Sequence, residues 1–320
     1  MSVLFAVFLA LALDHFLGEP RRLHPLVGFG RWATGIEQFL NSSSPGDALG
    51  AKARGILGCF CAVAPLVATS MLIAQAARVH PAIEIAVGGV FLYIAVGWNS
   101  LHRHANAVVT PLQRGELGRA RAAVAMLVSR DTDDLDEEGV ARAASESILE
   151  NGADAVFSAI FWFVLAGIPG VVLYRLANTL DAMWGYKTPR FHAFGWCAAR
   201  VDDLLNYLPA RLTAMSYALL GNTRLALHCW LTQGPNWKSP NAGPVMAAGA
   251  GALNVSLGGD SRYNQKIERR PRLGPESSRD SQFTANASTI EAACRLVDRS
   301  LALWCVCLLG LTAVFTALGH

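Results

Sequence analysis

Carboxylates, amides and arginines are concentrated between residues 129 and 243 of a chain that is otherwise strongly apolar. Only 16% of the 320 residues are charged, whereas soluble domains average about 25%. Ionisable groups beside apolar segments are costly unless they are paired or functional. We therefore interpret this region as a polar reaction site at the edge of a membrane. The net charge of +3 is too mild to indicate nucleic-acid binding.

Three carboxylates recur at helical spacing at Glu146, Glu150 and Asp154, and Asn151 lies beside them. A solvated helix face neutralised by Arg142 is the structural alternative. The row runs directly into an apolar segment, however, where a solvated face has little room. The pattern therefore indicates either a general base, for which Glu146 and Glu150 are the candidates, or oxygen ligands for Mg²⁺.

Two further clusters share one chemistry and one spacing: Arg175, Asn178 and Asp181, and then Arg200, Asp203 and Asn206. In a helix, residues three apart share a face. Structural pairing of arginine with aspartate inside a bundle would explain each cluster alone. Because a Gly-Tyr-Lys turn separates the two, they look more like a single site for a cation and a phosphate group.

The elements that must position these residues are mostly apolar helices. A helix that crosses the hydrocarbon core needs about 20 apolar residues. The predicted spans are 2–17, 55–77, 82–98, 155–176 (broken at 167–170) and 301–318. We predict an all-α fold over residues 1–320 as one domain, a polytopic integral membrane helical bundle with a cytoplasmic-facing polar cavity and soluble helical loops.

Several segments between the spans have distinct patterns. The segment 204–220 contains polar residues and a proline, and is predicted to be amphipathic. Residues 113–151 predict two soluble helices, the second capped by Asp133 or Asp134. An apolar row on that second helix consists of Val140, Ala144 and Ile148. Residues 257–288 are rich in Gly, Ser, Arg and Pro, and predict an exposed loop.

Loop charges predict the orientation. Arginines and lysines gather in 19–54 and 99–154, so the positive-inside rule places both segments in the cytoplasm. If the Gly-Ile-Pro-Gly run at 167–170 turns the fourth apolar element back, residues 177–203 face the cytoplasm too. We therefore expect a multi-pass protein of the bacterial inner membrane with its active site on the cytoplasmic side.

In order and spacing, these segments resemble the adenosylcobinamide-phosphate synthase (CobD/CbiB) family of cobalamin biosynthesis. The motifs that carry the resemblance are Leu13-Asp-His-Phe-Leu-Gly-Glu-Pro20, His24-Pro25, Ser129-Arg-Asp-Thr132, Glu150-Asn151, Phe161-Trp162, Leu173-Tyr-Arg175, Asn178-Thr-Leu-Asp181, Gly185-Tyr186, Gly195-Trp196, Ala199-Arg200, Asp202-Asp203, Pro209-Ala-Arg211, Ser239-Pro-Asn-Ala-Gly243 and Arg270-Pro271. The chain departs from the family's pattern at Ala155, at Pro244-Val-Met246 and at Tyr263-Asn-Gln265.

The resemblance implies an acid–amine ligase. Such an enzyme joins a carboxylate of adenosylcobyric acid, a corrinoid, to (R)-1-aminopropan-2-ol or its O-phosphate. An amine does not attack an unactivated carboxylate at neutral pH, so ATP is expected to form an acyl phosphate first, with Mg²⁺ on oxygen ligands. The other expected partners are the lipid bilayer and further cobalamin-assembly enzymes, but no nucleic acid.

Roles can then be assigned to the polar residues. Glu146 or Glu150 is the expected base for the amine. The expected ligands of Mg²⁺ are Asp181, Asp202, Asp203, Asn178 and Asn206. Arginine suits bidentate phosphate contact, and lysine a point contact. The expected substrate- and phosphate-binding residues are His24, Arg130, Asp131, Asn151, Asp154, Arg175, Lys187, Arg200, Arg211, Ser239 and Asn241.

Two other classes of protein are less consistent with the sequence. A membrane prenyl- or phosphotransferase would need two facing D-x-x-x-D-type clusters, whereas here the first cluster has one aspartate and the second has adjacent ones. A membrane sensor or assembly protein of the same fold would have lost the acidic and Ser-Pro-Asn-Ala-Gly segments. Both segments are present.

Overall fold

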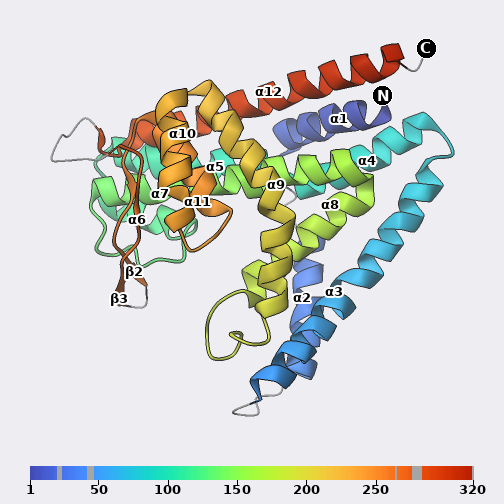
Figure 1. Ribbon diagram of the computed structural model, residues 1–320, viewed down its shortest axis with the longest axis horizontal. Helices are drawn as coiled ribbons and strands as arrows, with labels where there is room; N and C mark the ends of the chain where they lie inside the picture. Colours follow the sequence, from blue (N-terminus) through green and yellow to red (C-terminus); the bar gives the residue numbers. More distant parts are fainter. Residues whose placement is uncertain (20–23, 42–46, 264, 276–282, 319–320) are drawn as a thin grey trace. The chain divides into compact units, whose positions relative to one another are not determined.

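The computed structural model is helical over 77% of its length and describes residues 1–19, 24–41, 47–263, 265–275 and 283–318 (Figure 1). The chain divides into two compact units. The first comprises residues 1–97 and 158–206, and the second comprises residues 98–157 and 207–320. Each unit therefore combines an early and a late part of the sequence.

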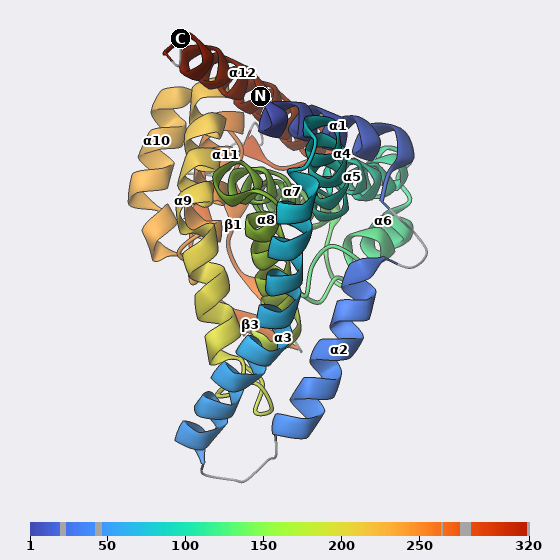
Figure 2. The same cartoon turned by 90° about the vertical axis from the view of Figure 1, so that its right-hand side faces the viewer.

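The first unit consists of helices α1 (Ser2–Leu17), α2 (Pro25–Leu40), α3 (Ala48–Ala77), α4 (Pro81–Ala95), α8 (Ser158–Trp184) and the first part of α9 (Trp196–Leu220). Side chains of His24, Asp47 and His80 cap the starts of α2, α3 and α4, with proline in the first turn of α2 and α4. Helix α1 lies along α4, and α2 lies beside α3 (Figure 2). The rings of Trp184 and Phe194 meet edge to face in the core of this unit.

Helix α8 is interrupted inside its apolar part, as predicted for residues 167–170. Gly167 has φ 63° and ψ −148°, a conformation that is essentially restricted to glycine, and Pro169 follows two residues later. The prediction of a break in this element is confirmed.

The second unit contains α5 (Trp98–Gln113), α6 (Leu117–Val124), α7 (Glu137–Gly152), the π-helical turn η1 (Ala153–Phe157), the rest of α9, α10 (Thr223–Thr232), the 3-10 turn η2 (Gly234–Asn236), α11 (Ala242–Leu253) and α12 (Ala287–Leu318). The predicted apolar row of α7 is fully buried. The predicted cap of α7 is wrong by two or three residues, because the side chain of Asp136 accepts the hydrogen bond from the Gly139 amide at 2.7 Å.

Short strands replace part of the loop predicted for residues 257–288. β1 (Leu257–Gly258) pairs with β4 (Arg272–Leu273), and β2 (Ser261–Tyr263) pairs with β3 (Lys266–Glu268), both antiparallel. Leu257 and Leu273 are buried. The prediction of a loop is therefore wrong for these strand residues, whereas exposure is confirmed for several of them, including Ile267, which is 70% exposed.

Four helical stretches among the described residues are long and apolar enough to cross a membrane: Ala48–Ala77, Pro81–Gln113, Glu137–Trp184 and Ala287–Leu318. Large apolar side chains such as Phe60, Leu72 and Phe315 are more than two-thirds exposed on them, as expected for surfaces that face lipid. Residues 204–220 of α9 are amphipathic, as predicted, with Leu208 and Leu219 exposed and Ala214 and Tyr217 buried. The chain is an all-α polytopic membrane protein.

Candidate active site

Asp202 on α9 is the centre of a polar cluster in the first unit. The side-chain amide of Asn178, on α8, donates to one carboxylate oxygen at 3.2 Å, and the amide of Asn206 donates to the other at 3.1 Å. The buried Asn206 is itself fixed, because its amide oxygen accepts a hydrogen bond from the Ser158 hydroxyl at 2.8 Å. Both asparagines therefore orient Asp202.

Asp181 lies one turn beyond Asn178 and within electrostatic range of Asp202 and Asp203. The chain leaves α8 at Gly185, whose backbone amide donates to the Asp181 carbonyl at 2.7 Å. A Cβ at Gly185 would lie 2.0 Å from an Asp181 carboxylate oxygen. Glycine is therefore required at this position for Asp181 to keep its place.

Burial raises the pKa of Asp202 above its ordinary value, and the charge of Asp203 raises it further, against the lowering effect of the two asparagine hydrogen bonds. Burial also raises the pKa of Asp203, and the charges of Arg200 and Lys187 offset this only in part. The cluster therefore concentrates negative charge that a bound cation would stabilise.

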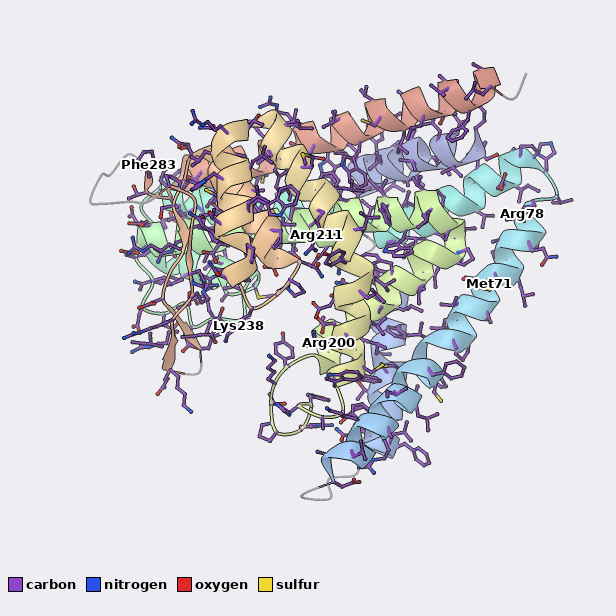
Figure 3. The ribbon with its side chains drawn as sticks, in the orientation of Figure 1. Met71, Arg78, Arg200, Arg211, Lys238 and Phe283 are labelled. Atoms are coloured by element: carbon purple, nitrogen blue, oxygen red, sulfur yellow. The ribbon has the colours of Figure 1, made fainter. Side chains whose placement is uncertain are left out.

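Two of the predicted cations of this unit, Lys187 and Arg200, lie beside the acidic residues. Arg200 approaches the Asp203 carboxylate at 3.3 Å with a side chain that is 61% exposed (Figure 3). Lys187, in the exposed turn after α8, lies within electrostatic range of the same carboxylate. Exposed ion pairs add little stability, so both cations can turn to a phosphate group at small cost.

The carboxylates of Asp181, Asp202 and Asp203 can supply part of a Mg²⁺ coordination shell. No three His, Cys, Asp or Glu side chains within the described ranges form a metal-binding group by themselves. Mg²⁺ usually takes one or two protein carboxylates and completes its shell with water and substrate phosphates, which Asp181, Asp202 and Asp203 can satisfy. The amides of Asn178 and Asn206 point their nitrogens at Asp202, so these residues suit a positioning role better than a ligand role.

Glu146 is the centre of a buried network in the second unit. Its side chain is only 2% exposed and is bound by the guanidinium groups of Arg130 and Arg270, the latter at 3.1 Å, and by the Gly258 amide at 2.8 Å. A carboxylate held by two cations and closed to solvent is a poor proton acceptor for an incoming amine. The assignment of Glu146 as a base is therefore not supported by its surroundings.

Arg130 and Asp131 also serve the fold in this structure. The Arg130 side chain is 8% exposed and bound to Glu146, where the sequence predicted a phosphate contact. Asp131 accepts the Gln265 amide at 2.7 Å, and its own amide donates to the Arg262 carbonyl at 2.8 Å. Asp131 thus holds the β2–β3 pair, and Arg130 also donates to the Ser261 hydroxyl on β2 at 3.4 Å.

Arg270 has a role that the sequence did not assign. Besides Glu146, it contacts the Gly259 carbonyl and lies 4.9 Å over the Trp237 ring. The only signal was its place in the Arg270-Pro271 motif, which carries no information about a partner 124 residues away.

Glu150 and Asp154 are partly exposed, in contrast to Glu146. The π-helical turn that starts at Ala153 displaces Asp154 from the regular row, and Asn151 donates to the carbonyl and hydroxyl of Ser147. Glu150 is therefore the remaining candidate for a base.

Arg211, Ser239 and Asn241, predicted separately, lie together in the second unit. Arg211 donates to the Asn241 amide oxygen at 2.7 Å and to the Pro240 carbonyl at 2.8 Å (Figure 3). The Ser239 hydroxyl accepts the Ala242 amide at 3.1 Å, at the start of α11. Burial lowers the pKa of Arg211. A guanidinium beside a helix N-terminus forms a favourable place for an anion.

His24 and Arg175, also predicted to bind substrate or phosphate, have contacts of a different kind. His24 accepts the Leu26 amide at 3.2 Å and so caps α2. Burial lowers the pKa of His24; the charge of Glu19 opposes this shift and that of Arg175 reinforces it. Arg175 lines an apolar cleft, and its contact with the cluster is a hydrogen bond of 3.3 Å to the Asn178 amide oxygen.

The chain is similar to known proteins over most of its length. Residues 7–297 match the family described as CobD/Cbib protein. The chain is 54% identical over 309 residues to "Cobalamin biosynthesis protein CobD" of Stutzerimonas stutzeri, covering 97% of this chain and 98% of the relative. It is 54% identical over 303 residues to the protein of that name from Chromobacterium violaceum, covering 93% and 94%.

A more distant relative of the same name, from Mycobacterium tuberculosis, is 38% identical over 274 residues and 84% of both chains. No solved structure is significantly similar to the chain. Because the family model matches most of the chain and the identity extends over nearly its full length, the chain belongs to the CobD/CbiB protein family.

Proposed function

We propose that this protein works in cobalamin biosynthesis as an adenosylcobinamide-phosphate synthase. It joins a carboxylate of adenosylcobyric acid to the amine of (R)-1-aminopropan-2-ol or of its O-phosphate, with consumption of ATP. The observation that carries the proposal is the partly buried Asp202, oriented by two amides and surrounded by Asp181, Asp203, Lys187 and Arg200. Carboxylates and exposed cations in one cluster suit a nucleotide with its metal.

The chemistry has two steps. A carboxylate oxygen of the corrinoid attacks the terminal phosphorus of ATP, which gives an acyl phosphate and ADP. The amine then attacks the acyl carbon, phosphate leaves with the C–O bonding electrons, and a base takes the proton that the nitrogen loses. Mg²⁺ would neutralise phosphate charge and align the nucleotide.

The residues take distinct parts in this scheme. Asp181, Asp202 and Asp203 would hold the cation, while Asn178 and Asn206 keep Asp202 in place. Lys187 and Arg200 would bind nucleotide phosphate, and Arg211 with the turn at residues 239–241 would bind a second anion, such as the phosphate of the amine substrate. Glu150 is the proposed base.

The proposal is tested with protein purified in mild detergent. It is incubated with adenosylcobyric acid, ATP, Mg²⁺ and either amine. The products are then separated and identified by mass spectrometry. We expect a new amide and an equal amount of ADP, both abolished when ATP or Mg²⁺ is omitted. Amide formation without ATP, or ATP hydrolysis that does not depend on the amine and the corrinoid, would contradict the proposal.

A further inference from the structure

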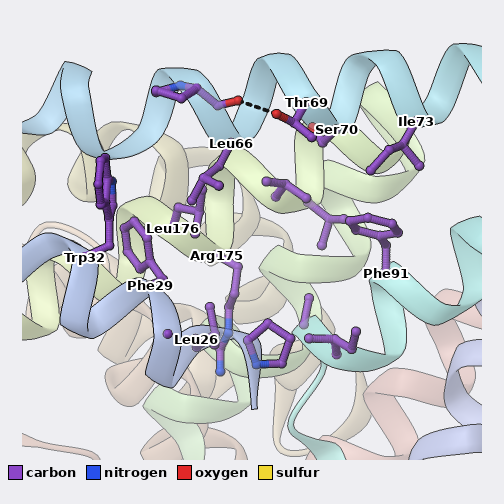
Figure 4. A pocket seen from close by; sticks show the side chains of 17 residues that line it. Leu26, Phe29, Trp32, Leu66, Thr69, Ser70, Ile73, Phe91, Arg175 and Leu176 are labelled. Atoms are coloured by element: carbon purple, nitrogen blue, oxygen red, sulfur yellow. Dashed lines mark hydrogen bonds between the residues drawn. The ribbon is translucent and has the colours of Figure 1, made fainter. Parts of the chain in front are cut away.

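An apolar cleft in the first unit has no part in the proposed reaction. Its volume is about 620 Å³, which is within the range of small-ligand sites. Helices α2, α3, α4 and α8 line it, with Phe29, Leu66, Ile73 and Phe91 among the side chains (Figure 4). Three of the lining helices, α3, α4 and α8, belong to membrane-spanning candidates.

The cleft offers almost no polar group to a ligand. The hydroxyl of Thr69 donates to the Pro65 carbonyl at 2.8 Å (Figure 4). The hydroxyl of Ser70 donates to the Val67 carbonyl at 2.7 Å. Both hydroxyls are thus satisfied within their own helix. A polar metabolite or a nucleotide would lose its hydration here without compensation.

Among the described residues that line the cleft, Arg175 is the single cation. Its Nε atom is buried and has no hydrogen-bond partner among the described residues, and its Nη1 atom makes a hydrogen bond of 3.3 Å to the Asn178 amide. No carboxylate within the described ranges forms an ion pair with it at 4.0 Å or less. A partly buried guanidinium whose buried Nε has no partner, in an apolar cleft, calls for an anion.

The residues at the edge of the cleft indicate that it lies near the headgroup layer of the membrane. Trp32 lines it with about half of its surface exposed, and Arg31 precedes it in the chain. Tryptophan and arginine are enriched where membrane proteins meet the headgroup layer. The occupant must therefore combine a long apolar part with an anionic group near the membrane surface.

We propose that this cleft binds an anionic phospholipid of the bilayer, with an acyl chain between α2, α3 and α8 and the headgroup phosphate at Arg175. A phospholipid provides both required parts and is abundant around membrane-spanning helices. The inference is independent of the proposed reaction, since it concerns a ligand that is not consumed.

Gly28 provides a way to fill the cleft without touching Arg175. It lines the cleft, and a Cβ at this position would meet nothing within 4 Å. Gly35 lies two turns further along α2 and is equally open, but it lines a separate groove with Ile36 and Leu57. Gly28→Leu should therefore exclude an acyl chain, and Gly35→Leu is the matched control with the same gain in helix propensity.

The test is native mass spectrometry of protein released from nanodiscs that contain equal phosphatidylglycerol and phosphatidylcholine. We expect one retained phosphatidylglycerol on the wild type and on Gly35→Leu, and none on Gly28→Leu. Arg175→Gln should weaken retention of the anionic lipid by about 10- to 100-fold, the range for a hydrogen bond to a charged group. Arg175→Lys should restore part of it.

Three results would overturn the proposal: equal retention on Gly28→Leu and Gly35→Leu, a preference for phosphatidylcholine, or recovery of a free fatty acid in place of a phospholipid. Circular dichroism of each variant shows whether its helices are intact. Because lipid mass is the readout, the outcome does not depend on turnover.

Discussion

Asn178 and Asp202 lie on different helices of the first unit, and the Asn178 amide donates a hydrogen bond of 3.2 Å to the Asp202 carboxylate. The two residues are 24 positions apart in the chain. A second asparagine holds the other oxygen of the same carboxylate. This arrangement fixes the direction of the charge to which the proposed cation binds.

Replacing Asp202 should remove activity and leave the fold in place. Asp202→Asn keeps the shape of the side chain but loses the charge, so we expect a fall in kcat/KM of at least 100-fold. Asn178→Ala, which removes only a residue that orients it, should cost about 10- to 100-fold. Asp133→Asn, at an exposed position, is the control. Near-normal turnover of Asp202→Asn would exclude a ligand role.

Activity should depend on pH through Asp202. A cation binds the ionised carboxylate, so kcat/KM should rise with pH through the raised pKa of Asp202. The asparagine hydrogen bonds lower this pKa. Asn178→Ala should therefore move the acid limb to higher pH, whereas Asn106→Ala, on an exposed helix face, should not. An acid limb that stays in place in Asn178→Ala would contradict this role.

The raised pKa of Asp202 also predicts how the stability of the fold changes with pH. The folded protein holds the Asp202 proton more tightly than the unfolded chain does. The resulting stabilisation is fully present below the ordinary aspartate pKa and is lost as pH rises through the raised value. Chemical denaturation at several pH values should show this loss, and it should be smaller in Asp202→Asn.

Glu146→Gln should destabilise the second unit, because two buried guanidinium groups would lose their counter-charge. Breaking such a pair costs about 3–5 kcal/mol. Glu138→Gln is the control on the same helix, since its ion pair with Arg142 is exposed and worth about 0.5 kcal/mol or less. Thermal unfolding in detergent measures both. An unchanged melting temperature with lost activity in Glu146→Gln would restore Glu146 as the base.

Gly167→Ala should lower stability by about 1–3 kcal/mol, because only glycine adopts the backbone angles of this break without strain. Gly310→Ala is the control: it lies in α12, with open space around a new Cβ, and should stabilise the helix by about 0.5–1 kcal/mol. Equal effects of the two substitutions would show that the break tolerates a side chain.

The position of residues 177–203 relative to the membrane is a further prediction. A cysteine at Thr188, which is exposed, is placed in a background in which the seven native cysteines are replaced. We expect a membrane-impermeant maleimide to leave it unlabelled in intact cells. A cysteine at the exposed Val79 should be labelled, because the short connection between α3 and α4 has few basic residues and is expected to face outside. Labelling of position 188 from outside would show that α8 crosses the membrane fully.

Local chemistry explains which features could be predicted from the sequence. The break at Gly167 was predictable because the Gly-Ile-Pro-Gly run disfavours a straight helix by itself. The buried row at Val140, Ala144 and Ile148 follows from helical periodicity. The residues of the acidic cluster were recognisable because their spacing on α8 and α9 places them on helix faces.

Contacts between distant segments could not be predicted. Glu146 has helical spacing with Glu150, but its burial depends on Arg130 and Arg270, which come from other segments. The strands of 257–273 have two or three residues each, too short to show an alternating pattern. The asparagines' positioning role depends on which atoms face Asp202, and spacing does not contain this information.

Oxygen transfer tests the central claim, activation of the corrinoid carboxylate by ATP, most directly. Adenosylcobyric acid labelled with ¹⁸O in its free carboxylate is incubated with the protein, ATP, Mg²⁺ and the amine. The ¹⁸O content of the released phosphate is then measured by mass spectrometry. An acyl phosphate requires one ¹⁸O atom to appear in inorganic phosphate for each amide formed. Amide formed with unlabelled phosphate, or with AMP and diphosphate as products, would contradict the account.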